Sequence, residues 1–374
     1  MAKQNFDVVV IGAGIHGAAV ARQAVEAGKK VLILEQFDRP AKATSSRSSK
    51  LIHGGLRYLE SFNFGLVREC LLDRRRLLQD YGDLVHMQKF YIPIYKDTSR
   101  TRLTIRAGLS LYGLLGGLDE YSRFSMVPQS EWANLDGLEQ SDLLAVFQYW
   151  DAQTDDAKLT FRLLEEAVGM GATLLLNTRF SQCREQGEDL QVSFQRNDKT
   201  QAVTTRAVVN ATGPWVNETL QKFKPAIASL PMELVQGAHL ELPGSLEQGV
   251  YYLEAPQDRR AIFAMPWYDR ILFGTTETLY QGDPNQVQPT PQEIDYLLTV
   301  YNYYFPDKPL GKGDIINAWA GLRVLPAGDG NPFKRSRDTI LQSNRAKQPT
   351  VVSIYGGKLT SHYSTAKKVL KLLS

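Results

Sequence analysis

The chain has 374 residues, of which 43% are hydrophobic and 22% are charged, and its net charge is +3. These values are typical of a globular protein long enough for two structural units. The small net charge, without a long basic run, argues against nucleic-acid binding. Cys70 and Cys183 lie far apart in the sequence, so neither a disulfide framework nor a metal site is expected. We therefore expect a protein of a reducing compartment.

The N-terminus leads almost directly into an apolar run at residues 6–11, which leaves no room for a signal peptide. No apolar stretch reaches the ~18–20 residues that a membrane-spanning helix needs. We therefore expect a cytoplasmic protein that is soluble or lies on the cytoplasmic face of a membrane.

A dinucleotide-binding fingerprint begins at the same run. Residues 6–11 are typical of a buried strand, and residues 18–27 favour a helix. Between them lies the pattern G-x-G-x-x-G, formed by Gly12, Gly14 and Gly17. In such a unit the glycines permit a tight turn, let the backbone approach a pyrophosphate and let the helix pack on the strand. The order of strand, turn and helix therefore predicts a Rossmann-like unit.

A second strand, residues 31–34, ends in the acidic residue Glu35. A carboxylate at this distance from the glycines can accept hydrogen bonds from a ribose, so the unit prefers FAD or NAD to a 2′-phosphate. The Ser/Thr/Arg-rich loop that follows favours FAD, because such a loop runs along the cofactor in flavoproteins of the D-amino-acid-oxidase type. The loop residues expected to contact FAD are Thr44, Ser45, Ser46, Ser49, Lys50 and Leu51.

The middle of the chain continues the alternation of helices and strands. Residues 159–167 have apolar side chains at helical spacing, and Asp155 and Asp156 are expected to cap this helix. Strands are predicted at residues 173–176, 190–194 and 202–209. Small residues after the last of these strands allow a dinucleotide to approach, so the expected cofactor contacts are Ala211, Thr212, Gly213 and Trp215.

Short alternating runs between residues 231 and 317 predict an antiparallel sheet, the candidate substrate domain. The runs are residues 237–242, 249–254, 261–266 and 270–275. The expected fold is α/β, with a Rossmann-like FAD-binding domain interleaved with an α+β substrate domain. The FAD-binding domain is expected at residues 1–82, 146–228 and 318–374, and the substrate domain at residues 83–145 and 229–317.

The last expected element is a helix over residues 361–373, which follows Gly356-Gly357-Lys358-Leu359-Thr360. The positive N-terminus of this helix can face the flavin pyrimidine and stabilise an anionic reduced form. The expected cofactor contacts here are Gly357, Lys358, Leu359 and Thr360.

Residues 43–60 resemble the signature of the FAD-dependent glycerol-3-phosphate dehydrogenases, within the D-amino-acid-oxidase-like flavoprotein superfamily. The resemblance extends over nearly the whole chain, through further stretches in the family's order. These are residues 210–216, 274–276, 282–284, 320–323, 336–338 and 356–360. The first stretch and the Gly-Gly-Lys-Leu-Thr stretch are the more specific ones.

Three departures from the family pattern bear on the substrate and on chain length. The family commonly continues into a C-terminal helical domain, so this chain is expected to be a short form or a truncated piece. After Gly274-Thr275-Thr276 the family has an Asp and, two positions on, a Glu, whereas this chain has Glu277 and Leu279. An expected Gly-Ser-His stretch is Gly237-Ala238-His239, which removes a hydroxyl.

The resemblance implies oxidation of sn-glycerol 3-phosphate to dihydroxyacetone phosphate, with hydride transfer to flavin N5 and electrons passed to a quinone. A phosphate dianion is best held by several cations, because Arg contacts it bidentately and Lys adds a point charge. The matching motifs imply that Arg57, Tyr58, Arg323, Arg337 and Lys358 hold the substrate. Lys358 has a second expected role in tuning the flavin.

The general base stays open among three side chains. His53 and His239 both lie in matching motifs, and histidine titrates near neutral pH. Glu277 could serve if it is desolvated.

Residues 100–115 contain Arg100, Arg102 and Arg106 beside an apolar run and no acid. A basic amphipathic element of this kind suits an anionic membrane surface, and it equally suits a helix packed on the core. Peripheral membrane contact is therefore one expectation for this segment.

Two alternatives to the main interpretation remain. An oxidase or dehydrogenase of the same superfamily acting on an amino acid, an amine or a 2-hydroxy acid would use one or two cations for a carboxylate. A flavin-binding protein without turnover is the alternative from another class, which Leu279 favours and the retained Arg57, Arg323 and Lys358 oppose.

Overall fold

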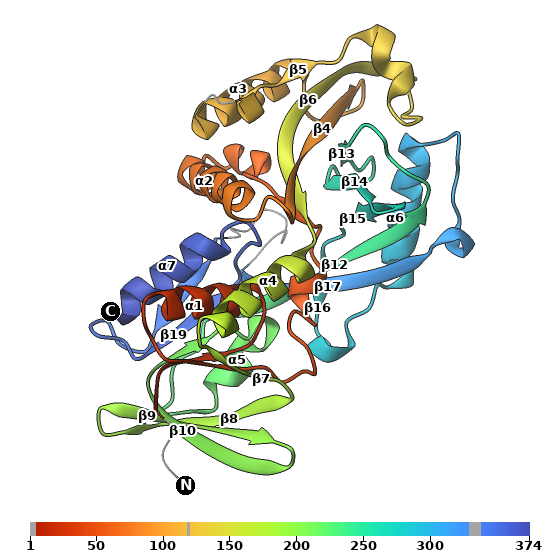
Figure 1. The fold of residues 1–374 in the computed structure, drawn as a ribbon. Helices are drawn as coiled ribbons and strands as arrows, with labels where there is room; N and C mark the ends of the chain where they lie inside the picture. Colours follow the sequence, from red (N-terminus) through yellow and green to blue (C-terminus); the bar gives the residue numbers. More distant parts are fainter. Residues whose placement is uncertain (1–4, 118–119, 329–337) are drawn as a thin grey trace.

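The computed structural model describes residues 5–117, 120–328 and 338–374, which form two sheets with helices on their faces (Figure 1). The first sheet contains β1 (Asn5–Ile11), β2 (Val31–Leu34), β7 (Thr173–Leu175), β8 (Thr178–Gln186), β9 (Asp189–Arg196), β10 (Lys199–Asn210), β11 (Phe223–Lys224), β18 (Ile340–Ser343) and β19 (Val351–Tyr355). The second contains β3 (Leu51–Ile52), β4 (Val85–Tyr95), β5 (Ser125–Met126), β6 (Leu143–Thr154), β12 (Met232–Pro243), β13 (Val250–Glu254), β14 (Ala261–Trp267), β15 (Arg270–Gly274), β16 (Thr278–Tyr280) and β17 (Asn317–Pro326). The α-helices are α1 (Ile15–Glu26), α2 (Phe64–Asp80), α3 (Arg102–Gly116), α4 (Asp156–Gly169), α5 (Val216–Leu220), α6 (Pro291–Tyr304) and α7 (His362–Leu373).

The first sheet has a parallel centre in which β1 pairs with β2 and β10, and β10 pairs with β19. The strands β8, β9 and β10 continue it as an antiparallel ribbon. Val8 and Val10 pack against the cluster that includes α1, α4 and α7, whereas Val9 and Ile11 pack with β8 and β9 on the other face. Because both faces of β1 are covered, its sequence is a continuous apolar run. Figure 1 shows α1 between α4 and α7 on one face of this sheet.

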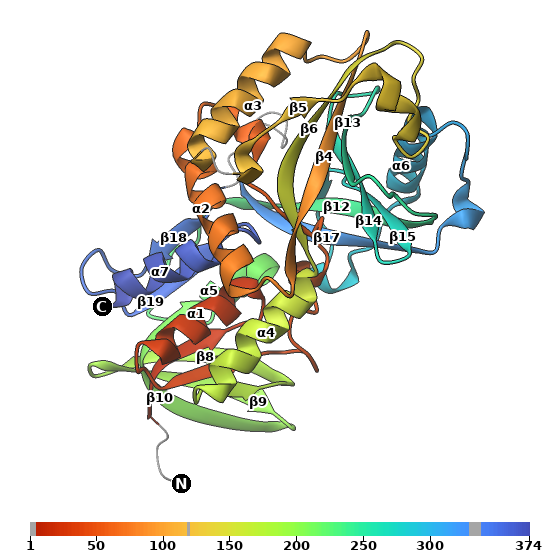
Figure 2. The ribbon, with the colours of Figure 1, turned by 45° about the horizontal axis from the view of Figure 1, so that its top comes forward.

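The second sheet is built around the long antiparallel pairs β4–β6 and β12–β17. Its one face packs on α6, through a cluster that includes Leu297 and Tyr301. Its other face packs on α2 and α3, through a cluster that includes Leu71 and Leu109. Figure 2 shows α2 and α3 beside β4 and β6, with α6 on the far side of the sheet.

The expected fold class is confirmed, and the predicted strands of residues 231–317 appear as β12 to β15. Two helices begin earlier than predicted. Helix α1 starts at Ile15 directly after the extended Gly14, because the buried side of its first turn overrides the weaker helix propensity of Ile15. Helix α4 starts at Asp156, with Asp155 as the N-cap accepting a hydrogen bond from Lys158 N.

Two of the expected domain boundaries fall at strands of the second sheet. Residue 146 lies inside β6, which pairs with β4, and residue 318 lies at the start of β17, which pairs with β12. The division into domains therefore stays a prediction. The chain crosses to the first sheet after β6 and again after β17. Within the described part of the chain, none of the helices has the length and apolar character that crossing a bilayer requires.

Candidate functional site

A long cavity runs between the two sheets, and the glycine turn after β1 forms one end of it. Gly12 has a φ of +100°, and a Cβ on Gly17 would lie 1.9 Å from the Gly12 carbonyl oxygen. Only glycine therefore lets α1 pack so closely behind the turn. Gly12 and Gly14 line the cavity, whereas Gly17 lies behind it as the packing residue.

Glu35, at the end of β2, is buried and lines the same end of the cavity. Its Oε2 accepts a hydrogen bond from Ala13 N at 2.8 Å, and its Oε1 accepts one from Phe37 N at 3.0 Å. Burial raises the pKa of this carboxyl, against the effect of the two amide donors. The carboxylate thus ties the glycine turn to the second strand, and its place on the cavity wall fits the expected ribose contact.

The loop after β2 crosses the N-terminus of α1. The Ser45 hydroxyl accepts a hydrogen bond from Ile15 N at 2.9 Å, and the Thr44 hydroxyl donates one to Leu322 O at 2.9 Å. Of the residues expected to contact the cofactor, Thr44, Ser45, Ser49 and Leu51 line the cavity. The loop is therefore fixed to α1 on one side and to β17 on the other.

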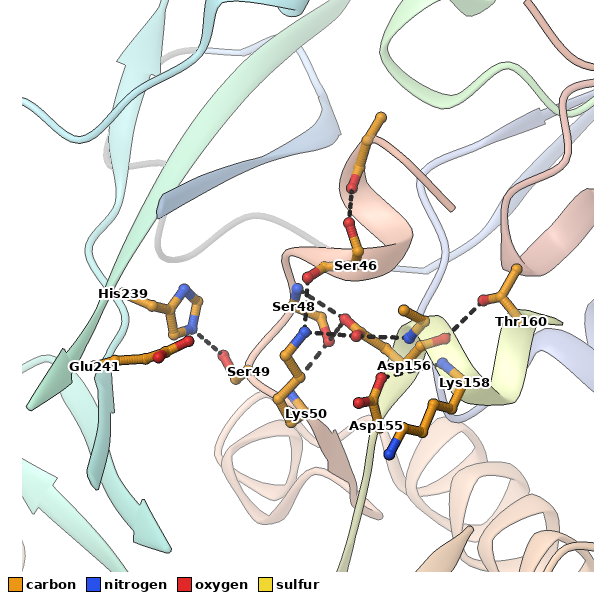
Figure 3. Close-up of polar contacts among 12 residues, drawn as sticks. Ser46, Ser48, Ser49, Lys50, Asp155, Asp156, Lys158, Thr160, His239 and Glu241 are labelled. Atoms are coloured by element: carbon orange, nitrogen blue, oxygen red, sulfur yellow. Dashed lines mark hydrogen bonds and ion pairs between the residues drawn. The ribbon is translucent and has the colours of Figure 1, made fainter. Parts of the chain in front are cut away.

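Two residues of this loop, Ser46 and Lys50, lie off the cavity wall and hold the loop itself (Figure 3). Lys50 Nζ donates to Ser46 O at 2.6 Å and to Asp156 Oδ1 at 2.5 Å, and the Ser48 hydroxyl donates to Asp156 Oδ2 at 2.6 Å. Asp156 is completely buried. Of the two aspartates expected to cap α4, Asp155 does so, while Asp156 mainly pairs with this buried lysine.

The stretch after β10 forms the wall opposite Glu35. Ala211 N donates to Ile11 O at 2.9 Å, which continues the pairing of the two strands. The buried Asn210 accepts a hydrogen bond from the Thr212 hydroxyl at 2.7 Å. The expected contacts Ala211, Thr212, Gly213 and Trp215 all line the cavity.

The loop before α7 closes the middle of the cavity. Gly357 has a φ of +97°, and a Cβ there would lie 2.2 Å from His16 Nε2. His53 N donates to the Thr360 hydroxyl at 3.1 Å, so this loop contacts the turn that follows β3. Gly357, Lys358, Leu359 and Thr360, the expected cofactor contacts of this loop, line the cavity.

Cationic side chains gather at the other end of the cavity. Arg323, on β17, donates from Nη2 to the Thr275 hydroxyl at 3.0 Å and from Nη1 to Thr276 O at 3.3 Å. Its Nη1 also lies 3.6 Å from Glu277 Oε1. Burial, together with the nearby charge of Arg57, lowers the pKa of Arg323 to about 10. An anion in this part of the cavity would therefore be attracted strongly.

Lys358 approaches the same end from the loop before α7. Its Nζ lies 3.7 Å from the centre of the Tyr58 ring and 4.0 Å from Cys70 Sγ. Arg57 and Tyr58 both line the cavity. The structure thus brings together Arg57, Tyr58, Arg323 and Lys358, whereas Arg337 lies outside the described residues.

Arg260 is a cavity residue that the sequence interpretation missed. Its Nη1 donates to Glu277 O at 2.8 Å, and its Nε lies 3.1 Å from Asp258 Oδ2. Arg260 directly precedes β14 and belongs to none of the glycine-containing motifs, so no local signal marks it. Its charge also contributes to the lowered pKa of Arg323. Glu277 lies next to both arginines.

The two histidines considered as general base have different surroundings. His239 is 1% exposed, its Nε2 shares a hydrogen bond with Ser49 Oγ at 2.9 Å, and its ring stacks on Trp319. Burial, with the charges of Arg323 and Lys50, lowers the pKa of His239 to about 3, so this ring is neutral at physiological pH. His53 also lines the cavity and is partly exposed.

Two of the departures from the family pattern lie outside the cavity wall. Leu279 is 50% exposed on β16 and is not among the lining residues, while Glu277 is. Ala238 is fully buried in the core, and its N donates to the Thr276 hydroxyl at 2.8 Å. Neither difference therefore removes a polar group from the cavity.

The cavity as a whole fits FAD by its shape and its chemistry. The glycine turn and the buried Glu35 carboxylate at one end of the cavity are groups that a dinucleotide requires. The loop before α7 lines the same cavity next to the cationic side chains. FAD, when bound, would supply the hydride acceptor, and the protein would orient the substrate and supply the surrounding charges.

Comparison with known proteins agrees with this fit. The family described as FAD dependent oxidoreductase (DAO) matches residues 7–367. D-erythritol 1-phosphate dehydrogenase of Brucella abortus is 34% identical over 98% of this chain and 73% of its own length. Glycerol-3-phosphate dehydrogenase of Pseudomonas aeruginosa is 36% identical over 98% of this chain and 71% of its own length.

Among solved structures, glycerol-3-phosphate dehydrogenase from Bacillus halodurans complexed with FAD matches with a TM-score of 0.79 and 26% identity. The match covers all of this chain and 65% of the Bacillus chain, so the chain spans about two thirds of that relative. The chain is an FAD-dependent oxidoreductase of the DAO family and belongs to its glycerol-3-phosphate dehydrogenase branch.

Proposed function

We propose that the chain oxidises sn-glycerol 3-phosphate to dihydroxyacetone phosphate. The observation that carries this proposal is the gathering of Arg57, Arg260, Arg323 and Lys358 at the end of the cavity away from the dinucleotide cradle. Several cations suit a phosphate dianion, whereas a carboxylate substrate needs one or two. A three-carbon phosphate held there would lie beside the loop before α7, which carries Lys358.

Anaerobic titration of the FAD-loaded protein tests this proposal through the flavin absorbance. We expect glycerol 3-phosphate to bleach the oxidised flavin, and glycerol to do so only at far higher concentration. D-erythritol 1-phosphate belongs in the same series, because it is the substrate named for the Brucella relative. Reduction by an amino acid or a 2-hydroxy acid alone would favour the superfamily alternative, and no reduction by any of them would favour a flavin-binding protein without turnover.

We propose His53 as the general base for the substrate hydroxyl. His239 is less suited because burial disfavours the protonated ring that forms when it accepts a proton, and because its Nε2 already shares a hydrogen bond with Ser49. Glu277 Oε1 lies 3.6 Å from Arg323 Nη1, so this carboxylate already faces an arginine proposed to hold the phosphate. The rate of flavin reduction against pH decides between them, because His53→Asn should remove the acid limb of the profile and Glu277→Gln should keep it.

A membrane quinone is the proposed electron acceptor, at a surface formed by α2 and α3. This surface exposes Phe62 (79%), Leu103 (78%) and Leu114 (60%), together with Arg102 and Arg106. Exposed apolar side chains beside cations suit an anionic bilayer on the cytoplasmic face.

Two residues of the segment are corrected by the structure. Arg100 pairs with Glu60 Oε1 at 2.5 Å and with Glu254 Oε2 at 2.9 Å, and Leu109 is 1% exposed in the core. Neither is available to lipid, so the proposed contact rests on Phe62 and on the exposed residues of α3 named above.

Co-sedimentation with anionic liposomes tests the membrane contact. The double change Arg102→Ala and Arg106→Ala should weaken attachment by about 1 kcal/mol per cation at low salt, and added salt should weaken the wild type. The matched control is Arg184→Ala with Arg206→Ala, two exposed arginines on β8 and β10 of the first sheet. Equal sedimentation of both double variants would reject this surface.

A further inference from the structure

A buried chain of hydrogen bonds links four separate segments beside the cavity. Gly54 N donates to the Tyr112 hydroxyl at 2.7 Å, and this hydroxyl donates to Asp151 Oδ2 at 2.7 Å. The other oxygen of Asp151 accepts from Arg74 Nη1 at 2.5 Å. The bonds thus join the turn after β3 to α3, β6 and α2.

The members of this chain are out of contact with water. Tyr112 and Arg74 are each 4% exposed, and Asp151 is 1% exposed. A buried ion pair contributes little net stability compared with apolar residues of the same size, but it enforces one geometry because a displaced partner leaves an unpaired charge. The presence of this ion pair beside the cavity therefore indicates that the groups it holds must keep one position.

The turn, which donates the Gly54 N hydrogen bond to Tyr112, has no freedom to move toward the helices. A Cβ on Gly54 would lie 2.5 Å from the Tyr112 hydroxyl and 2.6 Å from Leu71 Cδ2. The preceding pair of β3 and β6 is Ile52 with Ala152, so Asp151 comes next to the turn by strand register. The turn is thus pressed against α2 and α3 by packing as well as by hydrogen bonds.

Residues that line the cavity precede and follow this turn in the sequence. His53 N is held by the Thr360 hydroxyl at 3.1 Å, while the next amide, Gly54 N, is held by Tyr112. Gly55 then has a φ of +78° and leads into the short helix Leu56–Leu59, which carries Arg57 and Tyr58. A small rotation at Gly54 or Gly55 would move both side chains relative to the cavity.

We propose that Tyr112 and Asp151 are positioning residues that fix the Gly54-Gly55 turn and thereby hold Arg57 and Tyr58 against the substrate phosphate. The identity of the phosphate ester rests on the proposed function. The positioning itself does not, because any phosphate bound at this end of the cavity meets the same two side chains.

The test compares Tyr112→Phe with Tyr95→Phe in the FAD-loaded protein. Phenylalanine at 112 keeps the ring and removes the hydroxyl between Gly54 and Asp151. Tyr95 is the matched control, because it is 3% exposed and its hydroxyl donates to Glu139 O at 2.6 Å, outside the cavity wall. Tyr112→Phe loses two buried hydrogen bonds and Tyr95→Phe loses one, so both variants should lose thermal stability, and Tyr112→Phe should lose more.

We expect Tyr112→Phe to raise the KM for glycerol 3-phosphate and the Kd for inorganic phosphate by about five- to twentyfold, on the scale of one hydrogen-bonded contact. Phosphate binding is read from the change in flavin absorbance, and kcat and FAD content should change by less than about twofold. Tyr95→Phe should leave both constants unchanged. Unchanged constants in Tyr112→Phe, or equal changes in the two variants, would overturn the proposal.

A second variant keeps the proposal testable if Tyr112→Phe does not fold. The double variant Asp151→Asn with Arg74→Met preserves the shape of the acceptor side chain and leaves no unpaired buried charge, while it weakens the acceptor of the Tyr112 hydroxyl, so the same constants should rise in the same direction by a smaller factor. Unchanged constants there would count against the proposal. If glycerol 3-phosphate fails to reduce the wild-type flavin, the proposed function fails, while the phosphate titrations still decide the role of Tyr112.

Discussion

The two ends of the cavity are built in different ways. At the dinucleotide end, the glycine turn and the Glu35 carboxylate come from one short segment, residues 12–35, and the turn acts through its backbone. At the phosphate end, long cationic side chains come from Arg57, Arg260, Arg323 and Lys358, which lie far apart in the sequence.

This difference sets how each end responds to substitution. A backbone cradle leaves no space for an added atom, so it should fail completely when a side chain is introduced. Several cationic side chains contribute to binding the phosphate, so the affinity for phosphate should fall in steps as single side chains are removed. The experiments below test this contrast, from the largest expected effect to the smallest.

The largest effect is expected from Gly17→Ala. The new methyl group would lie 1.9 Å from the Gly12 carbonyl oxygen, so the turn must open. We expect a loss of about 3 kcal/mol in the free energy of unfolding, the upper end of the usual range for overpacking, and loss of bound FAD. Chemical unfolding and flavin content measure both. Gly65→Ala in α2 is the control, because nothing lies within 4 Å of its added Cβ.

A smaller, substrate-selective effect is expected from Arg323→Ala. Removing a charge-assisted contact should cost about 1.5–3 kcal/mol, or roughly 10- to 150-fold in kcat/KM, for glycerol 3-phosphate. Glycerol, which lacks the phosphate, should be affected far less. Steady-state kinetics with both substrates measure this, and Arg270→Ala on β15 provides a control. If the two substrates lose equally, the phosphate role of Arg323 is rejected.

Acid should destabilise both ends of the cavity through buried histidines. Burial lowers the pKa of His16 and His239 to about 3 and that of His362 to about 4. Because the unfolded chain takes up protons below its normal histidine pKa near 6.5 and the folded chain does not, stability is lost as pH falls from about 6.5 toward 4. Each group should contribute up to about 2 kcal/mol of this loss at pH 5.

Urea unfolding at pH 7 and pH 5 measures how much the free energy of unfolding falls between these two pH values. His239→Asn should reduce the difference between the two pH values, and His86→Asn, at an exposed site on β4, should not. The same pH dependence in both variants would contradict the assignment of this loss to the buried ring.

The smallest effect is expected from Leu279→Glu, which restores the acid of the family pattern. Leu279 is half-exposed on β16, outside the cavity wall. We expect less than a twofold change in kcat/KM and less than about 0.5 kcal/mol in stability. A large gain in activity would show that this strand reaches the substrate.

The dinucleotide end could be predicted from the sequence because its geometry is local. The turn at Gly12, the packing of Gly17 and the acid at Glu35 all depend on short-range spacing around one strand and one helix. The strands from β12 to β15 were predictable for a similar reason, because alternation is visible within a few residues.

The remaining features depend on pairs of residues that only the folded chain brings together. Lys50 was expected at the cofactor and instead neutralises Asp156, more than a hundred positions away. Arg260 has no motif, and its place in the cavity follows from how β14 aligns in the second sheet. Single-sequence patterns carry no information on such contacts.

The interleaving of the two sheets also constrains how the protein is made. The strand β19 pairs with β10 in parallel, and α7 packs on α1, so the sheet begun by the first residues is completed by the last elements described. A chain leaving the ribosome therefore cannot close this sheet until about residue 355 has emerged, and until then the end of β10 lacks its partner strand on one side. Late closure of distant contacts slows folding and leaves apolar strands open to misassociation during synthesis. A single cut of the chain cannot separate the two sheets, because the segments that form each sheet alternate along the sequence.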